Sequence, residues 1–279
     1  MPSNSNWFLQ FFNDEPDNYI YKKDNCKPLE IPKIFINRVY LINGSNGAVT
    51  DAQCDTMVEA LNIQLQSFCD DWSVKPVILA RSESPPPGSY QIILTSDTQY
   101  TIPGVYGYHM HPLADGTVKA YVCVNVILPA QNPPPGAILA INPNGVLYPT
   151  SALGASVSRV VSHELLEMII NPGLNKLYEA DVSNLLIRPK DPNGNDIVSG
   201  VFQFCAEVGD AVNQQSYTII TSDSTKVQVS DYVMPSWFSV FGKAPFNYNN
   251  TLQGPLTLSS GGYYSRENSS GTFSIEYKK

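Results

Sequence analysis

Two segments of this chain repeat apolar residues at helical spacing, and both lie among shorter segments with strand-like patterns. The first segment begins with a capping box, Thr50-x-x-Gln53, which predicts a helix over residues 50–71. The second predicts a helix over 151–170, with Thr150 as its N-cap and Asn-Pro-Gly at 171–173 as its end. The apolar residues that recur in the first segment are Cys54, Met57, Val58, Leu61, Leu65 and Phe68.

The order of the elements predicts the fold class. Apolar runs with strand character occupy 34–42, 76–80, 90–95 and 118–127, and further β-like runs follow the second helix. This order of strands and helices is typical of an α+β fold. We therefore expect one domain over 34–279, with a mixed or antiparallel sheet, two main helices and long Pro-rich loops such as 128–150. Residues 1–33 are polar and weakly periodic, so we expect an irregular N-terminal arm.

Composition excludes several classes of protein. At 279 residues and 43% apolar content the chain is not globally disordered, and about three quarters of its unfolded surface can be buried. The absence of a run of about 18 apolar residues argues against a membrane-spanning helix. A net charge of −8 without a basic run argues against nucleic-acid binding.

Low charge and scattered cysteines add two expectations. Charged residues make up 15% of the chain, against about 25% in a typical protein, and with 22 Pro and 16 Tyr this favours a loop-rich and β-rich body. The five cysteines form no Cys-x-x-Cys pair, so we expect buried free thiols. The N-terminus has no basic region of a secretory signal, which predicts synthesis in a cytoplasm and leaves a virion or non-classical export open.

The segment SHELLEMIINP at 162–172 carries the strongest chemical signal. His163 and Glu167 are four residues apart, so they share one helical face, and Glu164 points partly to the same side. Zinc peptidases use His-Glu-x-x-His, in which two imidazoles bind zinc and the Glu is the general base. Here Glu167 takes the place of the second imidazole, and a carboxylate is also a zinc ligand. This predicts His163 and Glu167 as metal ligands and Glu164 as the catalytic base. A solvated helix face with a carboxylate pair is the alternative.

Histidine is scarce, which narrows the search for a third ligand. Only three are present, and His109 and His111 lie in GYHMHP, where residues two apart face the same way in an extended chain. Glu207 and Asp210 in CAEVGD are the next acidic candidates. We leave the third zinc ligand open between Glu207 and His109. The sequence contains no Gly-x-Ser-x-Gly elbow, phosphate loop or dinucleotide fingerprint.

These motifs resemble those of a zincin-like, metallopeptidase-like family, found mostly in bacteria, whose reaction is not established. The resemblance covers about 34–265 and includes SHELLEMIINP, the GYH turn, EVGDAV, SDYVMPSWF, PLTLSSGGY and ALNIQLQSFCDDWSV. It implies a zincin-like fold and a site that includes His163, Glu164, Glu167, His109 and Glu207. The chain departs from the family at Met110, Asn171 and Gly209, where Asp, Asp and Cys are common, and its 128–150 and 183–200 segments are longer than usual.

Three functions remain open. The first is a zinc-dependent hydrolase, most simply a peptidase, whose peptide or protein substrate pairs with an edge strand at 118–127. The second is a catalytically inactive zincin-like scaffold that serves as a structural or binding protein in a virion, fibre or secreted assembly. The third is a binder of carbohydrate or another small ligand, which would use the aromatic residues Tyr106, Tyr108, Trp237 and Phe238.

Overall fold

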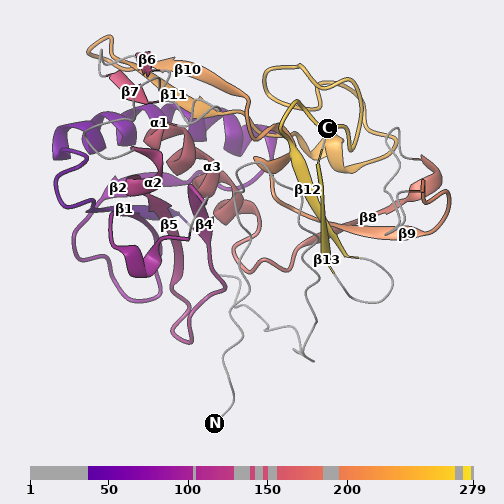
Figure 1. Cartoon of the computed structure of the whole chain (residues 1–279), viewed down its shortest axis with the longest axis horizontal. Coiled ribbons are helices and arrows are strands. Elements are labelled where there is room, and N and C mark those ends of the chain that lie inside the picture. Colours follow the sequence, from indigo (N-terminus) through magenta and orange to yellow (C-terminus); the bar gives the residue numbers. More distant parts are fainter. Residues whose placement is uncertain are drawn as a thin grey trace. The chain divides into compact units, whose positions relative to one another are not determined.

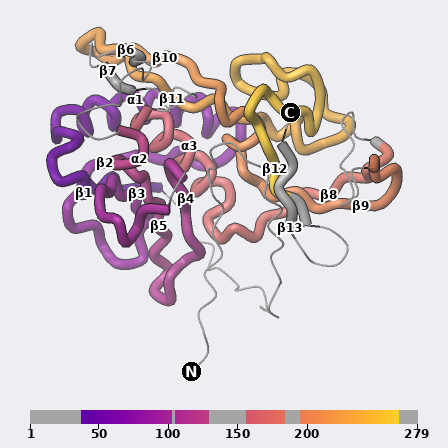
Figure 2. Tube along the Cα trace, viewed as in Figure 1, coloured from indigo at the N-terminus to yellow at the C-terminus, as the bar shows by residue number. Residues whose placement is uncertain are grey.

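The computed structural model describes residues 37–102, 105–128, 139–141, 147–149, 156–184, 195–267 and 273–277 (Figure 2). These residues form two compact units, and each is described by itself. Unit 1 lies within Lys33–Gly173 and Ser216–Ser230, and unit 2 within Leu174–Gln215 and Asp231–Lys279. The mixture of helices with mixed and antiparallel sheets confirms the α+β class. The predicted arm at 1–33 lies outside the described residues.

A five-stranded mixed sheet forms the base of unit 1 (Figure 1). Its strand order is β2-β1-β3-β5-β4, and β4 alone runs antiparallel to its neighbour, while the other pairings are parallel. Both β3 and β5 are almost continuously buried, as expected for inner parallel strands. The strands are β1 Arg38–Gly44, β2 Ile78–Arg81, β3 Tyr90–Thr95, β4 Gly107–His109 and β5 Val118–Cys123.

The prediction of an edge strand over 118–127 is wrong in two respects. The strand β5 ends at Cys123, and the next four residues form the short helix α2, Val124–Ile127. The strand also pairs on both sides, with β3 and with β4, so it is an inner strand. Within the described residues β4 pairs only with β5, and it therefore forms that edge of the sheet.

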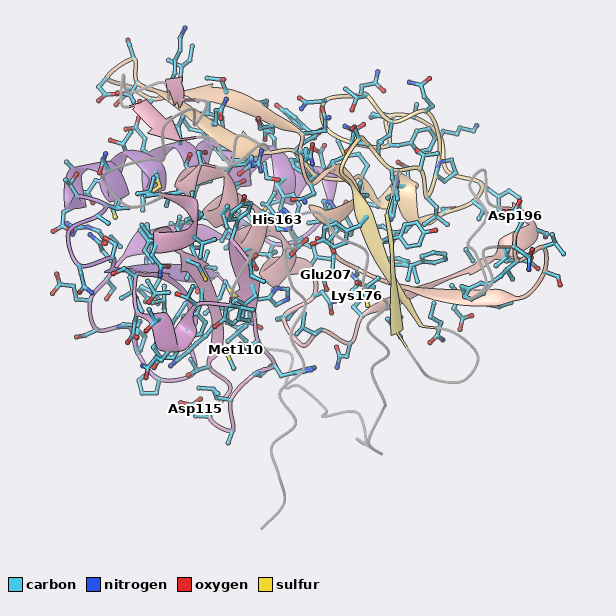
Figure 3. The ribbon with its side chains drawn as sticks, viewed as in Figure 1. Met110, Asp115, His163, Lys176, Asp196 and Glu207 are labelled. Carbon is cyan, nitrogen blue, oxygen red and sulfur yellow. The ribbon has the colours of Figure 1, made fainter. Side chains whose placement is uncertain are left out.

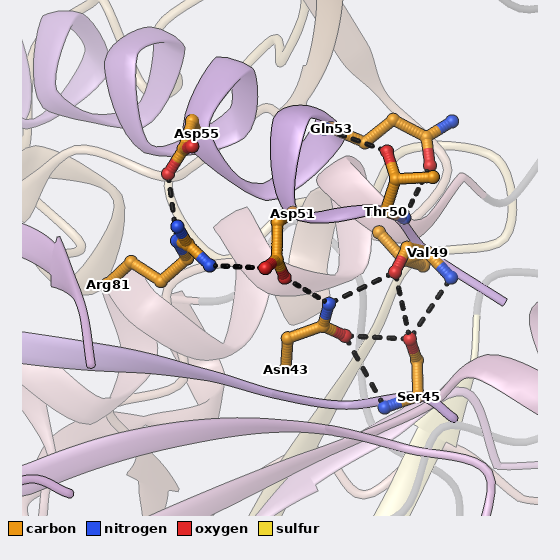
Figure 4. A network of polar contacts seen from close by, with 8 residues as sticks. All are labelled: Asn43, Ser45, Val49, Thr50, Asp51, Gln53, Asp55 and Arg81. Atoms are coloured by element: carbon orange, nitrogen blue, oxygen red, sulfur yellow. Dashed lines mark hydrogen bonds and ion pairs between the residues drawn. The ribbon is translucent and has the colours of Figure 1, made fainter. Parts of the chain in front are cut away.

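Helix α1, Asp51–Asp71, begins as predicted. The Thr50 hydroxyl accepts a hydrogen bond from the Gln53 amide at 3.2 Å, and the Gln53 side chain accepts one from the Thr50 amide at 2.8 Å. In Figure 4, Asp51 in the first turn accepts from Asn43 and pairs with Arg81, which also pairs with Asp55. The hydrogen bond from Asn43 and the Arg81 guanidinium hold the pKa of Asp51 below its usual value.

This cap gives a stability prediction. We expect Thr50→Ala to lower the free energy of unfolding by about 1 kcal/mol, because the backbone N–H of Gln53 then loses its acceptor. Urea unfolding followed by circular dichroism measures the change. Thr56→Ala, six residues further along the chain and inside the helix, is the control, because its hydroxyl donates to the Ala52 carbonyl and caps no helix end. Equal losses in the two variants would contradict the capping role.

Helix α3, Val157–Ile170, carries the SHELLEM segment and ends where predicted, with Asn171 as C-cap. Its start differs from the prediction, because Ser156 is the N-cap and accepts from the Arg159 amide at 3.2 Å. The helix therefore begins six residues later than expected, while Thr150 lies outside the described residues. All of its residues except Ser158 are buried, so its polar face is not solvated.

Both main helices of unit 1 pack on the same sheet and contact each other (Figure 1). The hairpin of β10 Ser216–Ile220 and β11 Lys226–Ser230 packs on these helices. A second short hairpin pairs β6 Leu139–Ile141 with β7 Leu147–Pro149. The cysteines at 54, 69 and 123 are buried and free, as predicted, and so is Cys205 in unit 2.

Unit 2 contains an antiparallel sheet in the order β13-β12-β9-β8. Its aromatic core includes Trp237, which packs edge-on against Phe238, and Phe204, which packs edge-on against Tyr264. No helix among the described residues is long and apolar enough to cross a membrane. The strands of unit 2 are β8 Leu177–Asp181, β9 Val201–Cys205, β12 Tyr263–Glu267 and β13 Phe273–Tyr277. Its short 3-10 turns lie at Val182–Asn184, Asp210–Val212 and Pro235–Phe238, and a further 3-10 turn, Thr98–Tyr100, belongs to unit 1.

Candidate metal centre

A buried polar network fixes α3 beside α1 and β11. The Ser162 hydroxyl donates to Gln64 Oε1 at 2.6 Å and accepts from the Ser230 amide at 3.0 Å. The Gln64 side chain also donates to the Ser230 carbonyl at 2.8 Å. These bonds join α1, α3 and β11 at Ser162, the residue that precedes His163. They therefore fix the position of the SHELLEM segment in the interior of unit 1.

Removal of the Gln64 side-chain amide from this network is expected to destabilise the fold. Gln64→Leu leaves Ser162 and Ser230 with buried polar groups that lose their partners, and we expect a loss of about 1–3 kcal/mol in the free energy of unfolding. Urea unfolding of this variant is compared with that of Gln66→Leu, an exposed position on the same helix. A loss no larger than that of the control would contradict the structural role of the network.

His109 and Glu164 meet between β4 and α3. His109 Nδ1 lies 3.5 Å from Glu164 Oε2, and the two atoms are not aligned as a hydrogen bond. The other ring nitrogen, Nε2, lies 3.3 Å from the carbonyl oxygen of Asn171, which ends α3. Because a carbonyl only accepts, Nε2 carries the proton of this contact and Nδ1 faces the carboxylate.

His163 and Glu167 form a second close pair, one helical turn apart as predicted. His163 Nε2 lies 2.9 Å from Glu167 Oε1. Two ligand atoms on a tetrahedral zinc ion with bonds of about 2.0–2.1 Å lie about 3.3 Å apart. The pair is thus close to the separation of two co-ligands, and the same distance also suits an ion pair with a protonated imidazole.

Glu167 brings the two pairs together, because it pairs with His163 and also lies near His109 and Glu164. Donor atoms of His109, Glu164 and Glu167 all lie within 4.8 Å of one another, and all three residues are buried. We call His109, His163, Glu164 and Glu167 together the His/Glu cluster. Its members His109, Glu164 and Glu167 can hold a metal ion geometrically, and the members of the cluster are also paired with one another. Figure 3 shows His163 among the side chains of α3.

Charge is concentrated near this cluster. Glu164 and Glu167 are 1% and 4% exposed, so water screens their charges poorly. Arg159, one helical turn before His163, is also buried. Burial lowers the pKa of Arg159 to about 10, and Tyr106 opposes that shift, so the guanidinium remains charged at neutral pH.

The structure brings together four of the five predicted site residues. His109, His163, Glu164 and Glu167 meet in unit 1, while Glu207 is buried in unit 2, near the 3-10 turn that begins at Asp210. Metal ligation by Glu207 therefore stays a prediction.

Other predicted residues have different surroundings. His111 is exposed in the loop after β4, which Met110 and Asp115 mark in Figure 3. The pKa of His111 is lowered, chiefly by partial desolvation, while a hydrogen bond to the backbone of Gly173 opposes the shift. The four aromatic residues of the carbohydrate hypothesis, Tyr106, Tyr108, Trp237 and Phe238, are all buried, and the two pairs belong to different units.

Sequence reasoning missed two contributors to the cluster. The Asn171 carbonyl orients His109, and its place at the helix end was visible in the Asn-Pro-Gly stop. Gly107 lies against Glu164 on the facing strand, and no sequence signal distinguished it from a turn glycine. Comparison of the chain with protein-family models, with curated proteins and with solved structures found no match.

Proposed function

We propose that the His/Glu cluster binds zinc and that the chain is a zinc-dependent hydrolase of peptides or proteins, built on a zincin-like fold. The observation that carries the proposal is the convergence of donor atoms from His109, Glu164 and Glu167 within 4.8 Å in a buried part of unit 1. Imidazole nitrogen and carboxylate oxygen are both common zinc ligands. A motif helix and an edge strand, which are far apart in sequence, supply these atoms.

The environment of Glu164 supports the presence of a cation. Burial of two carboxylates in one cluster is unfavourable unless positive charge compensates them. Glu164 Oε2 is buried and accepts no aligned hydrogen bond from the described part of the chain. A divalent ion would neutralise both carboxylates and leave the imidazoles in the neutral form that ligates metals.

Each residue then has a role. His163 and Glu167 hold the ion from one face of α3, and His109 approaches through Nδ1 because the Asn171 carbonyl orients its ring. Glu164 accepts the proton of the attacking water and returns it to the leaving amine. Zinc, when bound, supplies Lewis-acid polarisation of the scissile carbonyl.

The sheet edge supports a peptide as the substrate. In the described part of unit 1, β4 is paired on one side only, and it carries His109 at its end. An extended peptide can add to such an edge through main-chain hydrogen bonds. This would place a peptide bond beside the His/Glu cluster. The edge thus replaces 118–127 as the expected substrate strand.

A catalytically inactive zincin-like scaffold is the second candidate, as a structural or binding protein. The contact of 2.9 Å between His163 and Glu167 favours it, because a protonated imidazole would neutralise the carboxylate without a metal ion. The carboxylate of Glu167 would also make a bound zinc ion a weaker Lewis acid than a third imidazole would. In that case the chain would act through its surface.

Cleavage of a peptide library distinguishes the two candidates. The full chain is incubated with the library after zinc loading, after treatment with a chelator, and after zinc is restored, and products are identified by mass spectrometry. We expect cleavage that the chelator abolishes and zinc restores, that His163→Ala abolishes, and that His111→Ala retains. No cleavage by the zinc-loaded chain, or cleavage that the chelator does not reduce, would overturn the proposal of a zinc hydrolase.

A further inference from the structure

We infer that Gly107 is a positioning residue that keeps the Glu164 carboxylate in place, an inference that rests on the proposed function of the His/Glu cluster. A methyl group built on Gly107 would lie 2.6 Å from Val160 Cγ1, 2.8 Å from Glu164 Oε1 and 3.1 Å from Glu164 Cγ. Carbon atoms in favourable van der Waals contact lie about 3.5–4.0 Å apart, and the two carbon distances here are well below that range. Any side chain at 107 would therefore occupy the space of Glu164.

The backbone conformation of Gly107 is not the reason for a glycine here. Gly107 is absent from the residues with positive φ, and it pairs with Val122 as an ordinary strand residue. Its role is therefore steric: it allows α3 to approach β4 closely. Another residue could adopt the backbone conformation of Gly107, but its side chain would not fit in the space between β4 and α3.

The same face of β4 also supplies the other contact of the carboxylate. Gly107 and His109 are two residues apart, so their α-carbons present the same side of the strand to α3. Glu164 Oε1 lies over the space above Gly107, and Oε2 lies 3.5 Å from His109 Nδ1. One carboxylate oxygen of Glu164 thus lies in the space that the absent side chain of Gly107 leaves, and the other lies beside the imidazole of His109.

The surroundings determine which group would move if a methyl group were added. Strand β4 is paired with β5 at all three of its residues, and α3 is fixed by the Ser162–Gln64–Ser230 network. The Glu164 side chain is the softest of these parts, because it can change rotamer without breaking backbone hydrogen bonds. A methyl group at 107 would therefore turn the carboxylate away from His109 before it separated the helix from the sheet.

The test uses the ring nitrogens of His109 in the metal-free full chain, because their nitrogen-15 resonances report whether a carboxylate lies beside Nδ1. With only three histidines in the chain, His109→Gln identifies the signals. At one fixed pH, we expect Gly107→Ala to shift the Nδ1 resonance in the same direction as Glu164→Gln. Val160→Ala, which alters the other contact of Gly107, should leave the resonance at its wild-type position.

The double variant Gly107→Ala/Val160→Ala is the control for a general disturbance of packing as the cause of a shifted His109 resonance. It removes the clash with Val160 and keeps the clash with Glu164, so we expect a melting temperature above that of Gly107→Ala but the same displaced His109 resonance. A wild-type His109 resonance in either variant that carries Gly107→Ala would overturn the inference. Because these spectra need neither zinc nor activity, a chain that cleaves nothing would refute the proposed function and leave this test intact.

Discussion

Glu164→Gln is expected to lower the rate of peptide hydrolysis by about 10²–10⁴-fold, the contribution of a typical general base. The amide keeps the size of the carboxylate but cannot accept the proton of the attacking water. In the proposed roles His163 and Glu167 hold the ion, so zinc content should stay near that of the wild type. The turnover number and zinc content of the same purified sample measure both effects.

His163→Ala is the matched variant for this experiment. It removes a ligand nitrogen from the cluster, so we expect zinc and activity to be lost together. Full activity of Glu164→Gln on a cleaved peptide would show that Glu164 is not the base. Loss of zinc from Glu164→Gln would instead indicate that Glu164 is a ligand, in agreement with its place in the group of His109, Glu164 and Glu167.

The second large effect concerns the core of unit 2. Trp237 is 1% exposed, and its indole nitrogen donates to the Thr257 carbonyl at 2.7 Å. Its ring packs edge-on against Phe238 with centroids 4.8 Å apart. We expect Trp237→Ala to lower the free energy of unfolding by about 3–5 kcal/mol, because it opens a cavity and leaves the carbonyl without its donor.

Chemical unfolding followed by circular dichroism measures this loss. Trp237→Phe is the matched control, since it keeps a six-membered aromatic ring in the core and removes the pyrrole ring with its N–H and the hydrogen bond to Thr257. A loss smaller than that of Trp237→Ala is expected for it. If Trp237→Ala unfolds at the denaturant concentration of the wild type, the packing described for unit 2 is wrong.

Features that depend on nearby residues were predictable from the sequence. The capping box at Thr50 and Gln53 gave the start of α1 correctly, because both partners lie within one turn of chain. The start of α3 was misplaced because two hydroxyl residues, Thr150 and Ser156, compete as caps and apolar periodicity does not discriminate between them. Gly154, between them, is a poor helix former and favours the later of the two starts.

The order of the strands in the sheet could not be predicted from the sequence. The run at 118–127 is largely apolar, and whether such a strand lies inside a sheet or at its edge depends on which distant segment pairs with it. The partner, β4, is only three residues long and has no strand signal of its own. Helical spacing likewise predicted the pairing of His163 with Glu167, whereas the approach of His109 follows from the antiparallel return of β4 beside α3.

The most direct test of the zinc centre is the zinc content of the untagged full chain, measured by elemental analysis after dialysis against buffer with trace zinc. We expect about one zinc ion per chain in the wild type, which the paired removal of His163 and Glu167 side chains should abolish. His111→Ala should keep the wild-type content, because His111 lies outside the His/Glu cluster. A wild-type chain without zinc, or equal zinc in the cluster variant, would contradict a metal centre on α3.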